Sequence, residues 1–162
     1  MKIRWFRNFK IGVTNLIKWF PIIWNDRDWD HYYFHIMLRK KLNNMENFFR
    51  YYGNHLNAVK DADNIKICVN LLDRIIEDKY HEMFFNNHDK KWGEINLWCS
   101  DVPNNPGLRE VHVTRPKAIT QEEIDQERKE FKTLSSRQEQ QRIQDIKYLY
   151  DILKKYILCW WD

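Results

Sequence analysis

Residues that interrupt regular structure are scarce in this chain. Glycine and proline each occur only four times among 162 residues, whereas aromatic residues make up 15%. Turn-rich β folds need more of both residues, because they supply the backbone angles of tight turns. The sequence therefore predicts a mainly α fold, an antiparallel helical bundle of four or five helices with a β-hairpin or long ordered loop inserted around 87–118. A single helical domain, 1–162, suits this length.

Positive charge is concentrated near the N-terminus. The net charge is +4, from 27 Lys and Arg against 23 Asp and Glu. Residues 1–20 hold five basic residues and no acid, so the rest of the chain sums to −1, which is +4 minus +5. A broad nucleic-acid footprint needs a basic face on the body of the protein. We therefore expect no specific nucleic acid among its partners.

Cysteine usage and hydropathy bear on the compartment. Cys68, Cys99 and Cys159 show no paired spacing, and their odd number fits the reduced thiols of a cytosolic protein. No run of 18 apolar residues predicts a transmembrane helix. Lys18 interrupts the apolar N-terminal stretch and no small-residue cleavage site follows, which argues against a signal peptide.

Residues 1–20 read as an amphipathic basic helix that Pro21 should end. Its apolar residues recur at spacings of three and four, at Phe6, Phe9, Val13, Leu16, Ile17 and Phe20. Two interpretations stay open. In the favoured one, this helix docks on the rest of the chain with its lysines in water. In the other, it contacts a membrane surface, as basic and aromatic amphipathic helices do.

Two more helices are expected in the first half of the chain. The second begins at an N-cap supplied by Asp26 or Asp28 and ends near Tyr52, before Gly53. A third is expected over about 60–86. Their apolar stripes comprise Phe34, Leu38, Leu42, Met45, Phe49 and Tyr52 in the second helix, and Ile65, Val69, Leu72, Ile76 and Tyr80 in the third.

The second half of the chain changes character twice. Alternating residues at 94–97 and 109–114 flank a stretch dense in turn formers, which predicts the hairpin or loop within 87–118. Thr120 and Glu123 then form a capping box that opens a long C-terminal helical region, 120–159. Ser135 and Ser136 are expected to break or kink it. The polar arm 121–145 projects or pairs with another copy of the chain, which leaves a homo-oligomer open.

An unusual cluster of acids and indoles occupies residues 24–31. Its alternating acids at 26, 28 and 30 resemble the start of a calcium loop. His31 stands where that loop needs glycine and Met37 where it needs glutamate, so we reject this interpretation. The favoured structural reading has the acids capping a helix or pairing with Arg27, while Trp24 and Trp29 fill the core.

The C-terminal residues 159–162 form a second such cluster, with two adjacent indoles beside a carboxylate. Exposed indoles cost solubility, so Trp160 and Trp161 should pack on the body of the protein or line a pocket. Core packing is the favoured alternative.

Signals for enzymatic chemistry are weak, and we expect no enzyme, no bound metal and no cofactor. His31 and His35 share a helix face, as metal ligands can. His88-Asp89 is the dipeptide of helical metal phosphohydrolases of the HD type, but the neighbouring asparagines read as a loop. No glycine-rich phosphate loop or nucleophile motif is present. A metal-dependent phosphohydrolase is kept as a remote third alternative.

Both ends of the chain carry a resemblance. The segment Ile23-Trp24-Asn25-Asp26-Arg27-Asp28-Trp29-Asp30 and the terminal Trp160-Trp161-Asp162 resemble those of a set of small uncharacterised tailed-bacteriophage proteins. The resemblance implies a phage gene product made in the host bacterial cytoplasm. It brings no catalytic residues with it. Small phage proteins without enzyme motifs are often counter-defence factors, and some hold nucleotide signals of bacterial immunity without cleaving them.

We therefore expect a non-enzymatic phage accessory protein that binds and sequesters a nucleotide-type signal or a small host ligand. Aromatic faces stack on bases and cations contact phosphates. The expected ligand-binding residues are Trp24, Asp26, Arg27, Asp28, Trp29, Asp30, Trp160 and Trp161. The alternative is a helical protein–protein interaction factor that binds and blocks a host protein through the polar arm 121–145.

Overall fold

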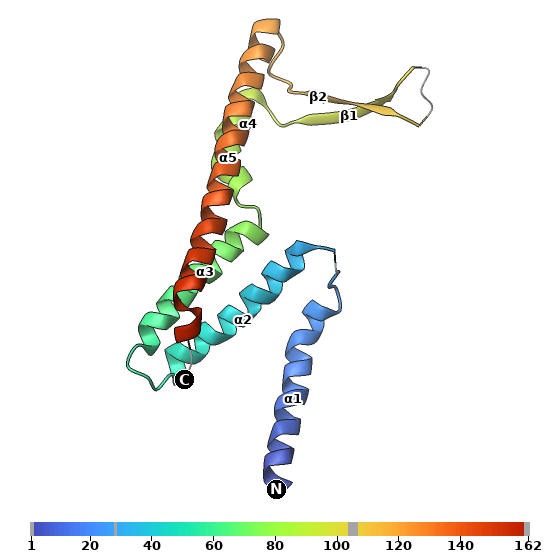
Figure 1. Ribbon diagram of the computed structural model, residues 1–162. Helices are drawn as coiled ribbons and strands as arrows, with labels where there is room; N and C mark the ends of the chain where they lie inside the picture. The colour runs from blue at the N-terminus through green and yellow to red at the C-terminus, as the bar shows by residue number, and fades with distance from the viewer. Residues whose placement is uncertain (1, 28, 104–106, 161–162) are drawn as a thin grey trace. The chain divides into compact units, whose positions relative to one another are not determined.

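The computed structural model describes residues 2–27, 29–103 and 107–160, and it confirms the mainly α class with an inserted hairpin (Figure 1). In chain order its elements are α1 (Lys2–Ile23), α2 (His31–Tyr52), α3 (Ala58–Ile76), α4 (Tyr80–Trp92), β1 (Asn96–Asp101), β2 (Arg109–Thr114), α5 (Gln121–Tyr156) and the short 3-10 helix η1 (Ile157–Cys159). The chain forms two compact units, Met1–Glu77 with Tyr148–Asp162, and Asp78–Lys147.

The first unit is built on α2 and α3, which pack along each other. Apolar side chains at helical spacing form its core, because burying each one stabilises the fold by about 1.5–3 kcal/mol. Arg39 of α2 reaches Asp73 of α3 at 3.0 Å beside this core. The buried apolar residues are Leu42, Phe49, Ala58, Ala62, Ile65, Cys68, Val69, Leu71, Leu72 and Ile75, with Leu149, Ile152, Leu153 and Trp160 from the C-terminal part.

The start of α2 differs from the predicted one. Asp30 is the N-cap, and its carboxylate accepts a hydrogen bond of 2.9 Å from the amide of Tyr32. Asp26 does not hold that position, and Asp28 lies outside the described residues. A cap must directly precede the first helical turn, and the chain becomes helical only at His31.

Proline does not end α1 where the sequence predicted. The helix passes Pro21 and closes at Ile23. Proline removes one backbone donor near the end of a helix, but the next turn still forms, with the Trp24 amide donating to the Phe20 carbonyl at 2.9 Å. The predicted boundary at residue 20 is therefore wrong by three residues.

The predicted third helix, 60–86, is two helices. Helix α3 ends at Ile76, and Asp78 adopts a left-handed backbone with φ of 46° before α4 begins at Tyr80. Aspartate is among the few residues other than glycine that tolerate this conformation. Residues 86 and 87, expected in a loop, are helical within α4. The expected break at Ser135 and Ser136 is absent too, since α5 is continuous through them.

The second unit packs α4 against the part of α5 that ends at Lys147. Tyr80, Phe85, His88 and Trp92 form the buried face of α4. The rings of Phe85 and Phe131 lie 5.2 Å apart, and the buried Tyr80 hydroxyl donates to the Asp145 carboxylate at 2.8 Å. These contacts join residues far apart in the sequence into one small core.

The hairpin leaves this unit through a closed base. Its antiparallel strands pair Asn96 with Thr114 at one end and Asp101 with Arg109 at the other. Gly93 turns the chain out of α4 with φ of 84°, and a Cβ there would lie 2.6 Å from Pro116. The Lys117 amide donates to the Trp92 carbonyl at 3.1 Å, which ties the returning strand to the same point.

The predicted capping box opens α5 as expected. The Glu123 amide donates to the Thr120 hydroxyl at 3.3 Å, and the Glu123 carboxylate accepts from the Thr120 amide at 2.9 Å. The hydrogen bonds that the Glu123 carboxylate accepts from the backbone amides of Thr120 and Ile119 lower the pKa of Glu123. The helix then runs unbroken for 36 residues.

Helix α1 does not bury its apolar face in the described structure. All six residues of its predicted apolar stripe are exposed, so α1 does not dock through this stripe on the described residues of the first unit, in contrast to the favoured interpretation. None of the helices within 2–27, 29–103 and 107–160 is long and apolar enough to cross a membrane.

Candidate functional site

The N-terminal part of the predicted site is open to solvent. Trp24 is 70% exposed, Trp29 is exposed as well, and the Arg27 guanidinium donates to the Asp26 backbone carbonyl at 2.9 Å. Asp30 is occupied as the N-cap of α2. The expectation that the two indoles fill the core is therefore wrong.

The C-terminal part is placed differently. Trp160 is only 5% exposed and belongs to the core of the first unit, as the structural alternative predicted. Trp161 and Asp28 lie outside the described residues. A base needs an open aromatic face to stack on, and Trp160 offers none without leaving the core. Among the described residues of the predicted site, Trp24 and Trp29 are thus exposed, Asp30 caps α2 and Trp160 is buried.

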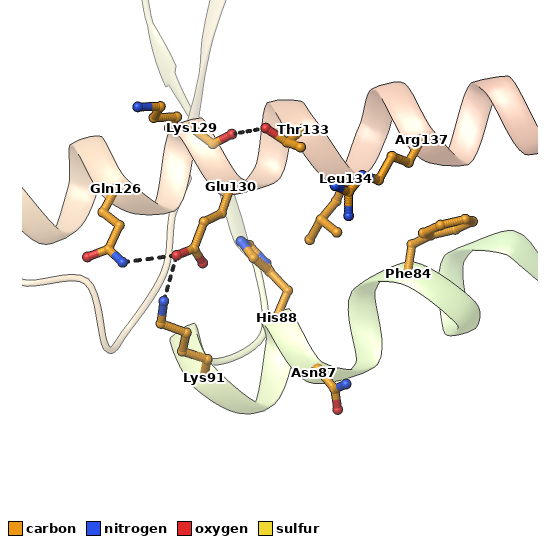
Figure 2. Close-up of a pocket in the computed structure, with 10 residues that line it drawn as sticks. All are labelled: Phe84, Asn87, His88, Lys91, Gln126, Lys129, Glu130, Thr133, Leu134 and Arg137. Atoms are coloured by element: carbon orange, nitrogen blue, oxygen red, sulfur yellow. Dashed lines mark hydrogen bonds and ion pairs between the residues drawn. The ribbon is translucent and has the colours of Figure 1, made fainter.

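A groove in the second unit has the properties expected of a ligand site. It lies between α4 and α5 and has a volume of about 650 Å³, within the range of small-molecule sites (Figure 2). Its lining combines cations, amides and apolar side chains. It consists of Phe84, Asn87, His88 and Lys91 from α4 and Gln126, Lys129, Glu130, Thr133, Leu134 and Arg137 from α5.

One end of the groove holds an anchored carboxylate (Figure 2). Glu130 accepts hydrogen bonds from Lys91 at 2.6 Å, from the Trp92 indole at 2.8 Å and from Gln126 at 3.0 Å. Led by the Lys91 bond, these interactions lower the pKa of Glu130 to about 2. Glu130 therefore stays ionised near neutral pH and positions Lys91 rather than exchanging protons.

The other end combines an aromatic ring with a guanidinium. Phe84, Leu134 and Arg137 lie there, away from Glu130 (Figure 2). The three cations Lys91, Lys129 and Arg137 and the single carboxylate of Glu130 give the groove lining a formal charge of +2. Such a lining favours a ligand that carries both an anionic group and a flat apolar part.

A buried histidine forms part of the wall. The side chain of His88 is 2% exposed and points between the two helices (Figure 2). Neither ring nitrogen has a hydrogen-bond partner within the described ranges. A buried polar atom without a partner costs about 1–3 kcal/mol. A ligand atom that bonds to this ring would recover part of that cost.

An ionic network stands behind the wall. Arg115 donates to Asp89 at 2.6 Å, to Glu127 at 3.0 Å and to the Gly93 carbonyl at 2.5 Å. Asp89 is the acid of the dipeptide that suggested a metal hydrolase, and here it binds a guanidinium. In the parts of the chain that the structure describes, no group of three or more His, Cys, Asp or Glu could hold a metal ion.

The first unit contains a smaller hollow of about 350 Å³. His55 and Asp61 lie in its lining with their side chains 3.0 Å apart, and Cys159 lies on the same hollow. Asp61 is largely buried and fixes the His55 ring, which also packs edge-on to Phe49 at 5.3 Å. Lys60 and Tyr156 also line this hollow, but its volume is only about half that of the groove between α4 and α5.

Comparison with protein-family models, with curated proteins and with solved structures gives no match. The choice of site therefore rests on geometry and charge. Sequence reasoning missed this groove because its lining comes from segments about forty residues apart, such as Lys91 and Glu130. The sequence signals near this groove were His88 of the His88-Asp89 dipeptide and the two basic residues that follow it, Lys90 and Lys91.

Proposed function

We propose that this protein binds, without turning it over, a small anionic ligand with a flat ring, of nucleotide type, in the groove between α4 and α5. The observation that carries the proposal is the +2 groove with Phe84 at one end and, in its wall, the buried His88, whose ring nitrogens have no hydrogen-bond partner among the described residues. The phage resemblance makes a nucleotide signal of the host the first ligand class to test. The proposed function is the one expected from the sequence, but we place the ligand site in the second unit instead of at the two ends of the chain.

The chemistry of the lining supports this ligand class. Phe84 offers a surface for a base, and Arg137 on the facing helix offers two parallel donors for phosphate oxygens. Asn87, Gln126 and Thr133 add neutral hydrogen-bonding groups along the groove. Glu130 would repel a phosphate. It is paired with Lys91 at the end of the groove opposite Arg137, so its negative charge lies away from the proposed phosphate position.

Thermal melting of the full chain against linear and cyclic nucleotides tests the proposal. A ligand that binds only the folded state stabilises it by about 2.7 kcal/mol at a hundredfold excess over its dissociation constant. We expect at least one nucleotide to raise the melting temperature. Melting with a parallel panel of divalent metal ions is the comparison, since a rise with metal ions alone would indicate a metal site instead.

Matched variants locate the site. Arg137→Gln removes the guanidinium of the groove, whereas Arg128→Gln removes an exposed one from the same helix. Arg137→Gln should bind the nucleotide at least tenfold more weakly, because a charge-assisted phosphate contact is lost. The nucleotide should therefore raise its melting temperature less, whereas the rise should persist for Arg128→Gln. No shift with any nucleotide, or equal shifts in both variants, would contradict the proposal.

A second candidate, the interaction factor, is favoured by the hairpin. Leu97, Cys99, Val111 and Val113 share one face, since they pair across the strands in register, and all are exposed. A two-stranded hairpin is marginal in water by itself and gains from a partner that covers it. Capture of a host protein that is lost in Val111→Thr/Val113→Thr but kept in Glu110→Thr would support this candidate.

A further inference from the structure

Most apolar residues of α1 lie along one face of the helix, which Lys10 borders, and three of its basic residues lie on the opposite face together with Ile11. The exposed apolar stripe comprises Trp5, Phe6, Phe9, Val13, Leu16, Ile17, Phe20, Ile23 and Trp24. Arg4, Arg7 and Lys18 recur at helical spacing on the other side, with Asn8 and Asn15 between them. A helix with this division is stable only where its two faces meet different surroundings.

The described residues of the first unit do not cover the apolar stripe. Each of its nine side chains is exposed. The residues of α1 that share a hollow with α2 are Asn15, Lys18 and Trp19, which belong to the polar side and its boundary. The apolar stripe is therefore open to a partner on this side of the first unit. A contiguous apolar surface of this kind marks an interaction site.

Charge identifies the chemistry of that partner. Five basic residues and no acid occur before Asp26, and the other residues of the chain are nearly neutral. A second copy of α1 would bring the same cations alongside the same stripe, so self-pairing meets repulsion. An anionic lipid surface supplies both an apolar layer for the stripe and phosphates for the cations.

The aromatic residues and the length fit the same surface. Trp5 and Trp24 stand near the two ends of the stripe, and indoles favour the boundary between lipid headgroups and acyl chains. The helix has 22 residues, which is about 33 Å at about 1.5 Å per residue. Its basic face keeps it from spanning a bilayer, so it would lie in the plane of the surface.

We propose that α1 binds the surface of an anionic lipid bilayer, lying flat with its apolar stripe among the acyl chains and its basic residues at the lipid phosphates. This inference is independent of the ligand groove, since α1 and the groove share no residue.

Co-sedimentation of the full chain with vesicles tests this proposal. Vesicles of phosphatidylcholine with phosphatidylglycerol are compared with vesicles of phosphatidylcholine alone. Each basic residue near an anionic surface changes the partition coefficient roughly fivefold. The variant Arg4→Gln/Arg7→Gln/Lys18→Gln should therefore bind the anionic vesicles about a hundredfold more weakly, and added salt should weaken binding of the unmodified chain.

A charge-matched control removes three exposed cations elsewhere. The variant Lys66→Gln/Lys132→Gln/Lys147→Gln has the same net charge as the α1 variant. It should keep nearly full binding to the anionic vesicles. Equal loss in both triple variants would mean that overall charge drives the binding, and this would overturn the assignment to α1.

A second pair of variants tests the apolar stripe. Leu16→Gln changes an exposed residue on the stripe, and Ile11→Gln makes a similar change on the basic side of the same helix. Leu16→Gln should lower vesicle binding roughly ten- to a hundredfold, and Ile11→Gln much less. Neither residue is buried, so circular dichroism should report folded protein for both.

The results also separate the competing occupants. Failure to bind anionic vesicles overturns the proposal whatever the groove binds. A dimer that Leu16→Gln dissociates, found together with absent vesicle binding, would instead assign the stripe to a second copy. Equal binding to both vesicle types would overturn the role given to charge.

Discussion

Replacing Arg115 with methionine should be among the most destabilising changes in the second unit. Its side chain is 3% exposed and donates to Asp89, Glu127 and the Gly93 carbonyl. Methionine keeps much of the volume but leaves two partly buried carboxylates without their cation. Breaking a buried ion pair from one side costs about 3–5 kcal/mol. At about 2–4 °C per kcal/mol for a chain of this size, the melting temperature should fall by roughly 6–20 °C.

Arg109→Met is the matched control for that experiment. Arg109 pairs with Asp101 at 3.6 Å, and its side chain is 74% exposed, so its loss should change stability by less than about 0.5 kcal/mol. Urea unfolding followed by circular dichroism measures both variants. Adding Glu127→Gln to Arg115→Met should recover part of the loss, because one unpaired charge then disappears. Similar effects for the two arginines, or no recovery in the double variant, would refute the reasoning.

Two further substitutions and one thiol titration test individual local contacts. Glu130→Gln should destabilise the protein near neutral pH. The difference from the unmodified chain should shrink as the pH falls from 4.5 to about 2, because a carboxyl whose folded pKa is lowered contributes stability only while it is ionised; thermal melting across that range measures it. Thr120→Ala should cost about 1 kcal/mol by urea unfolding, and Thr120→Ser much less, since serine keeps the capping oxygen. Burial raises the pKa of Cys68 to about 11, so an aromatic disulfide reagent at neutral pH should titrate the exposed Cys99 and Cys159 rapidly and Cys68 only on unfolding.

The parts of the fold that sequence predicted are those specified by local patterns. The capping box at Thr120 and Glu123 places both partners within one turn, so no distant contact is needed to recognise it. The stripe through Ile65, Val69 and Leu72 repeats at helical spacing and is buried as predicted. Gly53 likewise ends α2 at the expected residue.

The errors arose where backbone geometry or distant contacts decide. Asp78 separates α3 from α4 by adopting a left-handed conformation without a glycine to announce it. The buried face of α4 includes His88, a polar residue that breaks the apolar pattern on which helix prediction depends. Helix α5 continues through two serines because its packing against α4 outweighs their weak helix preference.

The candidate site could not be predicted for a related reason. Composition drew attention to Trp24 and Trp160, but indole content does not reveal that one is exposed and the other buried. The groove exists only because α4 lies against α5, and no periodicity in the sequence encodes which helices become neighbours. Phe84 and Arg137 carry no motif that would have linked them.

The closed base of the hairpin has a consequence for how this chain can vary. The contacts at Gly93 and Lys117 hold the two ends of the hairpin segment together. The segment between them can therefore be replaced without separating these ends. Its length can change at little thermodynamic cost, since doubling a flexible loop costs only about 0.6 kcal/mol. A short linker in place of residues 96–114 should leave the helices of the second unit folded. The hairpin can therefore vary in sequence and length while the helices of the second unit stay unchanged.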